Sequence, residues 1–520
     1  MSTFKAVWRR AAGADLFPAG ILAWLNLGLA LAAINRFGWF RDELYYIACS
    51  DHLALGYVDH PPLSIFILKI VRTLFGDSLF AVRLLPALGS AAFVLLAALI
   101  ARELGGKKRA MTLAASAAFA TANYFSFHIY SMNLWDLLVW SGILLVLARM
   151  VRNGNPRHWL GLGLLIGLGF QNKIGIVFLC FGIAAGVLLT PLRAHLKSRF
   201  FWLGLGLAAV LALPYVIWNA GHGWAHLQFL RNAAAEKNTP VTPLGFLAGQ
   251  VLYQNPVNIL VWIPGLWFFF RRADRTLRFF GWAFTAMFLA MMVAQGKDYY
   301  LSPAYPVLFA GGSLFWESLK PEKASRVLTS VFTGLIIVAG LLVRPIILPI
   351  LSVEKTQAYL KALDMPNTAA ERNAIGALPQ HFADMFGWEE MVSTYARILE
   401  TLGPEDRMRA VIYVRNYGEA GAIDFLGRPY GLPKAMCTHN SYWVWGPPEG
   451  KTGELMIVLG IYHDVQRSFE DISRFFESVE HVSTFKHPLA MPYENNRPIF
   501  LCRGLKVSWA ELWARDKHFI

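Results

Sequence analysis

Residues 38–63 read GWFRDELYYIACSDHLALGYVDHPPL and follow the first membrane-length apolar run of the chain. Residues 1–344 contain thirteen Asp and Glu residues, and four of them lie in this stretch: Asp42, Glu43, Asp51 and Asp59. Charged groups beside hydrocarbon are costly, so carboxylates that gather there indicate a polar cavity or a site. Tyr and Trp side chains are interleaved with them, as in pockets for sugars or lipid headgroups. The alternative is a solvated connection between two helices.

The composition of the 520 residues is that of a membrane protein. Hydrophobic residues make up 56% of the chain, and the mean hydropathy is +0.41. About 20 apolar residues cross a bilayer, so charge-poor runs of that length predict about eleven transmembrane helices. They lie at 16–35, 84–101, 110–130, 133–150, 158–172, 174–192, 200–219, 244–270, 279–296, 299–316 and 327–343. We therefore expect a polytopic α-helical membrane domain over residues 1–345.

The Lys and Arg residues predict the orientation of this domain. With the N-terminus inside, the inside connections carry 20 basic residues, including Lys5, Arg9 and Arg10. The short outside connections carry only four: Lys173, Arg231, Lys237 and Lys297. Since positive residues stay on the cytoplasmic side, residues 38–63 and the chain after 345 are predicted to face the periplasm of a bacterial inner membrane. The net charge of +14 is explained by this anchoring pattern and is not a nucleic-acid footprint.

The other outside connections also carry polar or aromatic residues. Asp136 lies in NLWDLL, Lys173 in GFQNKIGI, and Lys297 with Tyr299 and Tyr300 in AQGKDYYLSPAYP. The alternative to a functional role for Asp136 is polar packing between helices. For Lys173 the alternative is a side chain that only extends its ammonium group to the membrane interface. The presence of such residues in every outside connection predicts a site at this face.

From about residue 350 the long apolar runs stop. Short β-branched runs at 409–414, 454–460 and 497–503 predict strands, and 468–479 predicts an amphipathic helix. Residues 346–520 are therefore expected to form a periplasmic α/β domain. Within it, HNSYWVWGPP is compatible with buried packing and with a sugar-facing aromatic patch. Pairing of Cys437 with Cys502 also stays open, because spacing alone does not establish proximity.

The sequence contains no P-loop, no dinucleotide-binding glycine fingerprint and no HExxH motif. An enzyme at the outer face needs an activated donor that arrives through the lipid, and a polyprenyl-phosphate sugar meets this need. The protein must then supply a base for the acceptor hydroxyl and positive charge for the departing phosphate. Asp42 or Glu43 suits the first task. The second suits Lys173, Arg231, Lys237, Lys297, or a divalent metal ion held by Asp59.

Five segments resemble the bacterial members of glycosyltransferase family 39: RDELYY, VDHPPL, NLWDLL, NKIGI and GKDYYLSPAYP. This family is related to protein O-mannosyltransferases, the aminoarabinose transferase of lipid A and rhizobial galacturonosyltransferases. The resemblance covers most of residues 35–310. It implies the GT-C membrane fold and an inverting transfer from a polyprenyl-phosphate donor. It also implies that Asp42, the first acid of the pair, is the catalytic residue.

The resemblance suggests further roles. The acid-Lys-Pro segment that binds metal in the aminoarabinose enzyme matches Asp59-His60-Pro61, with Asp in place of Glu and His in place of Lys. Asp136 is expected to act as a carboxylate of the acceptor site or cavity. The expected substrate contacts are Tyr45, Tyr46, His60, Tyr299 and Tyr300.

We therefore expect a membrane glycosyltransferase whose acceptor is a lipopolysaccharide, lipid A or another glycolipid. A protein O-mannosyltransferase with a Ser or Thr acceptor is an alternative from the same class. A lipid or sugar transporter is an alternative from another class. The transporter is disfavoured because its path must reach both faces, often through inverted repeats, and the sequence shows neither feature.

Overall fold

The computed structural model describes residues 15–365, 367, 374, 376–448 and 450–520. The basic residues Lys5, Arg9 and Arg10 lie outside these residues. The chain divides into two compact units. The helical unit comprises Met1–Ile34, Phe80–Val216 and Pro240–Ser352. The mixed unit comprises Asn35–Leu79, Ile217–Thr239 and Val353–Ile520, so it adds two earlier segments to the part after the predicted division at residue 345.

The helical unit is built from apolar helices. Its helices are α2 (Phe17–Ala33), α5 (Leu79–Glu103), α6 (Lys108–Ala120), α7 (Met132–Asn153), α8 (His158–Phe170), α9 (Ile176–Leu188), α10 (Arg199–Gly221), α12 (Pro243–Tyr253), α13 (Ile259–Arg271), α14 (Arg278–Val293), α15 (Tyr305–Glu317) and α16 (Glu322–Ile347). Among the described residues, α5, α7, α10 and α16 are long and apolar enough to cross a membrane. The bent pair of α9 and η2 (Pro191–Lys197) would be a fifth span. The expected total of eleven spans stays a prediction.

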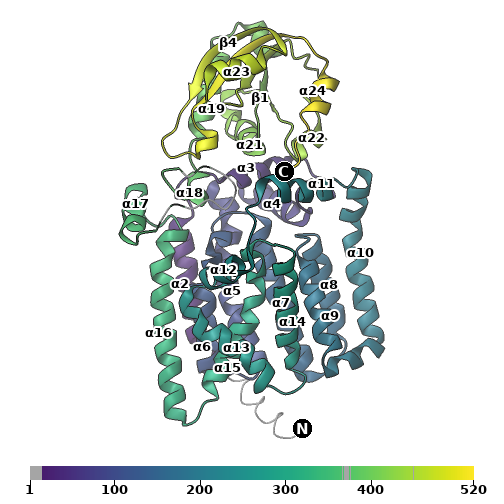
Figure 1. Cartoon of the computed structure of the whole chain (residues 1–520), viewed down its shortest axis with the longest axis vertical. Coiled ribbons are helices and arrows are strands. Elements are labelled where there is room, and N and C mark those ends of the chain that lie inside the picture. Colours follow the sequence, from purple (N-terminus) through teal and green to yellow (C-terminus); the bar gives the residue numbers. More distant parts are fainter. Residues whose placement is uncertain (1–14, 366, 368–373, 375, 449) are drawn as a thin grey trace. The chain divides into compact units, whose positions relative to one another are not determined.

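The connections rich in Lys and Arg meet at one end of the helical unit (Figure 1). Glu103, at the end of α5, lies 3.2 Å from Arg149 and 2.5 Å from Arg152 at the end of α7. Glu317, at the end of α15, accepts hydrogen bonds from the backbone N–H groups of Lys107 and Ala110. These contacts join neighbouring connections, which agrees with the alternation of helix direction inferred from the charges.

The mixed unit contains a five-stranded sheet in the order β2-β1-β3-β5-β4. The strands are β1 (Val411–Tyr413), β2 (Ala435–Met436), β3 (Leu455–Leu459), β4 (Phe476–Phe485) and β5 (Arg497–Leu505). β1 pairs parallel with β2 and β3, whereas β5 pairs antiparallel with β3 and β4. Met456, Val458, Phe500 and Cys502 contribute to the buried core of the sheet. The three predicted strands are confirmed as β1, β3 and β5.

The prediction of one helix over 468–479 is wrong in its second half. Helix α23 (Val465–Ile472) ends early, and Phe476 begins β4. Strand β4 contains the β-branched residues Val479, Val482 and Thr484. It pairs with β5 along its length, apart from a bulge between His481 and Ser483, and this ladder outweighs the helical periodicity. Cys437 and Cys502 are both buried and free, so they form no disulfide.

Residues 38–63 fold into the mixed unit as helix α3 (Arg41–Asp51) and a turn that leads to α4 (Leu63–Phe75). Helix α3 lies beside α21 (Tyr417–Leu426) in Figure 1. Gly421 permits this approach, because a Cβ there would lie 2.7 Å from the Leu44 backbone. The packing of α3 on α21 therefore brings the acidic stretch against residues almost four hundred positions later in the chain.

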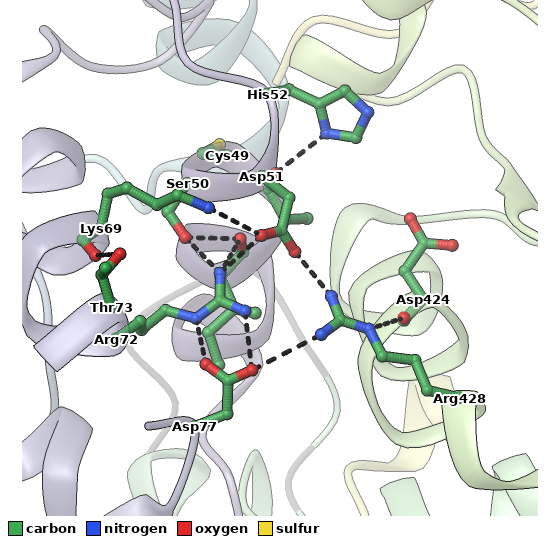
Figure 2. Close-up of polar contacts among 12 residues, drawn as sticks. Cys49, Ser50, Asp51, His52, Lys69, Arg72, Thr73, Asp77, Asp424 and Arg428 are labelled. Atoms are coloured by element: carbon green, nitrogen blue, oxygen red, sulfur yellow. Dashed lines mark hydrogen bonds and ion pairs between the residues drawn. The ribbon is translucent and has the colours of Figure 1, made fainter. Parts of the chain in front are cut away.

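An ion cluster at the other end of α3 joins the same segments (Figure 2). Arg72 lies 2.9 Å from Asp51 and 2.6 Å from Asp77. Arg428, which follows α21, lies 2.7 Å from Asp51 and 3.5 Å from Asp77. Burial opposes ionisation of Asp51, but Arg72 and Arg428 outweigh it and hold the pKa of Asp51 below its usual value. The cluster thus fixes α3, α4 and the segment after α21 as one body.

Candidate active site

The two acids at the start of α3 have different surroundings. Phe40 precedes the helix in an extended conformation. Glu43 is fully buried, and its Oε2 accepts a hydrogen bond of 3.0 Å from the Phe40 backbone N–H. A carboxylate at the third helical position satisfies an N–H that the helix itself cannot pair. Glu43 therefore stabilises the start of α3, and Asp42, with 37% of its side chain exposed, is the accessible acid.

Asp42 is held by two neighbours. The Tyr417 hydroxyl donates a hydrogen bond of 3.0 Å to Asp42 Oδ1, and Arg41 Nε lies 3.6 Å from the same oxygen. The other oxygen, Oδ2, has no hydrogen-bond partner among the described residues. Tyr417 is itself fixed, because α21 begins at this residue with a cap from Asn416 and Glu419. One oxygen of Asp42 is thus oriented and the other stays available.

A cavity of about 260 Å³ lies next to Asp42. Both of its neighbours, Arg41 and Tyr417, line this cavity. The remaining lining residues are Glu236, Lys237, Arg415, Asn416, His439, Tyr493, His518 and Ile520. Lys237 Nζ lies 5.9 Å from the centre of the Tyr417 ring. The cations Arg41, Lys237 and Arg415 outnumber the one acidic side chain in the lining, Glu236, so this cavity suits an anionic group.

The two histidines of this cavity add hydrogen-bonding groups rather than charge. Only 7% of His439 is exposed, and its Nε2 lies 3.0 Å from the backbone oxygen of Ile520. Burial, followed by the charges of His518, Lys237 and Arg41, places the pKa of His439 well below its usual value. Burial also lowers the pKa of His518. Both rings are therefore neutral at physiological pH, and the positive charge of the cavity comes from Arg and Lys.

The predicted residues around Asp59 form a packed cluster. The Tyr45 hydroxyl donates to Asp59 Oδ1 at 2.8 Å. His60 is fully buried and stacks on Tyr46 with ring centres 4.7 Å apart. Tyr45 and Tyr46 are buried too, and contact of these three rings with a substrate stays a prediction.

The expected metal ion needs a set of donor side chains. Among the described residues, no group of three or more His, Cys, Asp or Glu side chains is arranged to hold a metal ion. The Asp59 carboxylate accepts a hydrogen bond from the Tyr45 hydroxyl, which is a poor metal ligand while it is protonated. The described residues around Asp59 thus do not make up a metal-binding set, and the expected metal ion stays a prediction.

A second cluster lies within the helical unit. Lys173 Nζ lies 3.3 Å from Asp136 Oδ2 and donates to Asn133 Oδ1 at 2.8 Å. The same ammonium group lies 4.6 Å from the centre of the Tyr300 ring and 5.9 Å from that of Tyr299. Asp136, Lys173, Tyr299 and Tyr300 were each predicted separately from the sequence. In the structure they lie together around one buried ion pair.

Two predicted cations are not among the residues that line the cavity beside Asp42. Arg231 is exposed on α11 (Ala225–Asn232) in the mixed unit and does not line the cavity. Lys297 is half-buried in the helical unit, just before η5 (Asp298–Ala304). Of the four predicted phosphate ligands, Lys237 alone lines this cavity.

Sequence reasoning missed the contributions of Arg415, Tyr417 and Tyr493. These residues are more than 370 positions from Asp42 in the sequence. His439 lies in HNSYWVWGPP, most of which proves to be packing. For example, Trp443 and Trp513 exchange hydrogen bonds between their ring N–H groups and backbone oxygens. A signal existed in the glycine-rich stretch after 409–414, since such strand-to-helix turns often carry site residues.

The chain is similar in sequence to known glycosyltransferases. The family model described as dolichyl-phosphate-mannose-protein mannosyltransferase matches residues 59–218. The lipid A galacturonosyltransferase RgtD of Rhizobium johnstonii is 28% identical over 209 residues, which are 40% of this chain and 43% of that protein. The undecaprenyl phosphate-alpha-4-amino-4-deoxy-L-arabinose arabinosyl transferase 1 of Pseudomonas fluorescens is 25% identical over 199 residues, 34% of this chain and 36% of that protein. The matches thus span less than half of each relative.

The solved structures extend the likeness to nearly the whole chain. ArnT from Cupriavidus metallidurans bound to undecaprenyl phosphate superposes with a TM-score of 0.61 at 13% identity, over 94% of this chain and 98% of that one. The arabinofuranosyltransferase AftD from mycobacteria gives a TM-score of 0.53 at 13% identity, over 95% of this chain and 40% of that one. The chain therefore shares the fold of ArnT and AftD. In sequence the chain is similar to glycosyltransferases of the dolichyl-phosphate-mannose-protein mannosyltransferase type and to bacterial lipid A glycosyltransferases.

Proposed function

We propose that the protein is an integral-membrane glycosyltransferase of the bacterial inner membrane. It transfers a sugar from a polyprenyl-phosphate donor to lipid A or another glycolipid at the periplasmic face. One observation carries this proposal: an oriented, half-exposed carboxylate, Asp42, lies next to a cavity lined by Arg41, Lys237 and Arg415. The transfer needs these two elements together, namely a base and fixed positive charge.

The residues suggest a single displacement. The available oxygen of Asp42 accepts the proton of the acceptor hydroxyl as the hydroxyl oxygen bonds to the anomeric carbon. The bond from that carbon to the phosphate oxygen breaks, and the polyprenyl phosphate leaves with the electron pair. Arg41, Lys237 and Arg415 stabilise the charge that develops on the phosphate. Attack opposite the leaving group inverts the configuration at the anomeric carbon.

Tyr417 and Glu43 position the base in this scheme. The hydrogen bond from Tyr417 fixes Oδ1, so that the other oxygen of Asp42 is turned toward the acceptor. Glu43 secures the helix start on which Asp42 is carried. Both are positioning residues, because neither touches the reacting atoms.

The names of the relatives support the donor and acceptor classes. One is named for galacturonosyl transfer to lipid A, and the other for an undecaprenyl-phosphate-linked aminoarabinose donor. The description of the matching family favours a second candidate, a mannosyltransferase with a protein hydroxyl as acceptor.

A donor and acceptor screen tests the proposal. The full chain in nanodiscs is given undecaprenyl-phosphate sugars or nucleotide sugars, with lipid A or a Ser/Thr peptide as acceptor. Transfer from the lipid-linked donor to lipid A is expected. Transfer to the peptide alone would select the second candidate, and transfer that requires a nucleotide sugar would overturn both.

A further inference from the structure

A second cavity lies in the helical unit. Its lining residues are apolar, whereas the cavity beside Asp42 is lined mainly by charged and polar residues. The apolar cavity has a volume of about 260 Å³, and its walls come from α8, α9, α10 and η2. They include Trp159 and Ile166 of α8, Ile183 and Leu188 of α9, and Leu205 and Ala208 of α10. An apolar cavity of about 150 Å³ already binds benzene and excludes water. This larger one is suited to a hydrocarbon chain.

Glycine contacts explain why this space exists. Helices α8 and α10 cross closely at Gly163 and Gly204, where a Cβ on Gly163 would overlap the Gly204 backbone oxygen. The glycines of α9 face α14 instead, since a Cβ on Gly186 would lie 2.6 Å from the Phe279 ring of α14. The chain then bends by 103° between α9 and η2. Since α9 is drawn to α14 and α10 to α8, side chains between them do not close the gap.

Basic residues surround one end of this cavity. Arg157 precedes α8, Arg193 and Lys197 lie in η2, and Arg199 begins α10. All four are exposed, and none of them has a carboxylate within ion-pair distance among the described residues. The guanidinium carbons of Arg157 and Arg199 lie 5.9 and 5.1 Å from the centre of the same ring, that of Phe200. Two like charges are thus held near each other without a counter-ion from the described part of the chain.

A further donor lies beside these cations. The Trp159 ring N–H donates to His195 Nδ1 at 3.0 Å. In the neutral ring the proton therefore lies on His195 Nε2, which is free to donate to an acceptor oxygen. Trp159 lines the cavity and marks the depth at which apolar and polar surroundings meet.

We propose that the apolar cavity and the basic residues at its end form one groove, which binds an anionic diacyl phospholipid of the bilayer. One acyl chain occupies the apolar cavity, and the phosphate lies between Arg157 and Arg199. Charge complementarity selects this occupant, because basic pockets between membrane helices attract anionic headgroups, whereas a zwitterionic lipid brings its own cation. The inference does not depend on the proposed transfer reaction, since no residue of the groove belongs to the candidate active site.

Native mass spectrometry of the full chain tests this site. The protein is released from nanodiscs that contain equal amounts of dioleoylphosphatidylglycerol and dioleoylphosphatidylcholine. Wild type is expected to retain phosphatidylglycerol. The double substitution Arg157→Gln and Arg199→Gln should weaken its binding about thirtyfold, the effect of two cations at a lipid surface. The matched control, Arg271→Gln with Arg272→Gln, removes the same charge at another connection and should retain the lipid.

A second variant probes the cavity without a change of charge. Ala184 lines the groove and is exposed, so Ala184→Trp should fill the space without unfolding the helices. It should lose phosphatidylglycerol and keep the wild-type melting temperature in lipid-free detergent. Equal retention by wild type and the Arg157/Arg199 variant would overturn the proposal, as would equal retention of both lipids. Displacement by one equivalent of undecaprenyl phosphate would assign the cavity to the donor and overturn it too.

Discussion

Replacement of Tyr417 by Phe isolates the orientation of the base. The change deletes the hydroxyl that donates to Asp42 Oδ1 at 3.0 Å. It keeps the ring, whose centre lies 4.6 Å from that of Tyr45. A hydrogen bond to a charged acceptor contributes about 1.5–3 kcal/mol, or about a 10- to 150-fold change in rate if the transition state needs all of it. Because Arg41 Nε stays 3.6 Å from the same oxygen, we expect a loss near the lower limit, about tenfold.

The assay is single-turnover transfer at saturating donor, with donor affinity measured separately. Tyr417→Phe should lower the rate of transfer and leave donor affinity almost unchanged. Tyr442→Phe is the matched control, because its hydroxyl donates at 3.0 Å to Asp424, a carboxylate outside the cavity. A rate for Tyr417→Phe that is no lower than that of the control would refute the role of Tyr417 in orienting Asp42.

Three other predictions concern charge, pH and orientation. Lys237→Gln with Arg415→Gln should weaken undecaprenyl phosphate binding about a hundredfold, because two charged contacts are lost; unchanged binding would place the phosphate elsewhere. Asp51→Asn should cost about 1–3 kcal/mol in unfolding free energy at pH 7. Since the folded pKa of Asp51 is lowered, this cost should be constant above the ordinary carboxyl pKa and should shrink as the pH falls through the lowered folded pKa, and a cost that does not change with pH in the acid range would contradict the ion cluster. A Glu470→Cys, Cys180→Ser variant should react with an impermeant thiol reagent in spheroplasts, whereas protection would reverse the proposed orientation.

The apolar helices were predictable because the pattern that defines them is local. A run of apolar residues without charges favours a helix that is shielded from water, and each predicted span overlaps a helix of the structure, although 244–270 covers two, α12 and α13. The strands of the mixed unit were predictable for a similar reason, since β1, β3 and β5 are short β-branched runs between turn residues. The end of α23 was not predictable from the sequence. Strand β4 is stabilised by its ladder with β5, and the periodic pattern at 468–479 carries no information about that partner.

The candidate site was predictable only in part. The unusual placement of two acids marked Asp42 and Glu43, and their separate roles depend on which carboxylate turns back to the Phe40 N–H. Phe40 has no side-chain oxygen, so the usual capping signal is missing. Tyr417 reaches Asp42, and Arg415 lines the cavity beside it, through the packing of α3 on α21, which depends on Gly421 and is not encoded in any short segment.

Asp42→Asn tests the central claim most directly. The substitution keeps the size of the side chain and its contact with Tyr417, but it removes the basicity, and a positioned base contributes about 10²–10⁴ in rate. Glu43→Gln should cost less, because the amide oxygen still accepts from the Phe40 N–H, and Asp274→Asn serves as a control at an exposed connection. Single-turnover transfer from an undecaprenyl-phosphate sugar should fall by at least about a hundredfold in Asp42→Asn with donor affinity largely kept. A wild-type rate in that variant would contradict the assignment of Asp42 as the base.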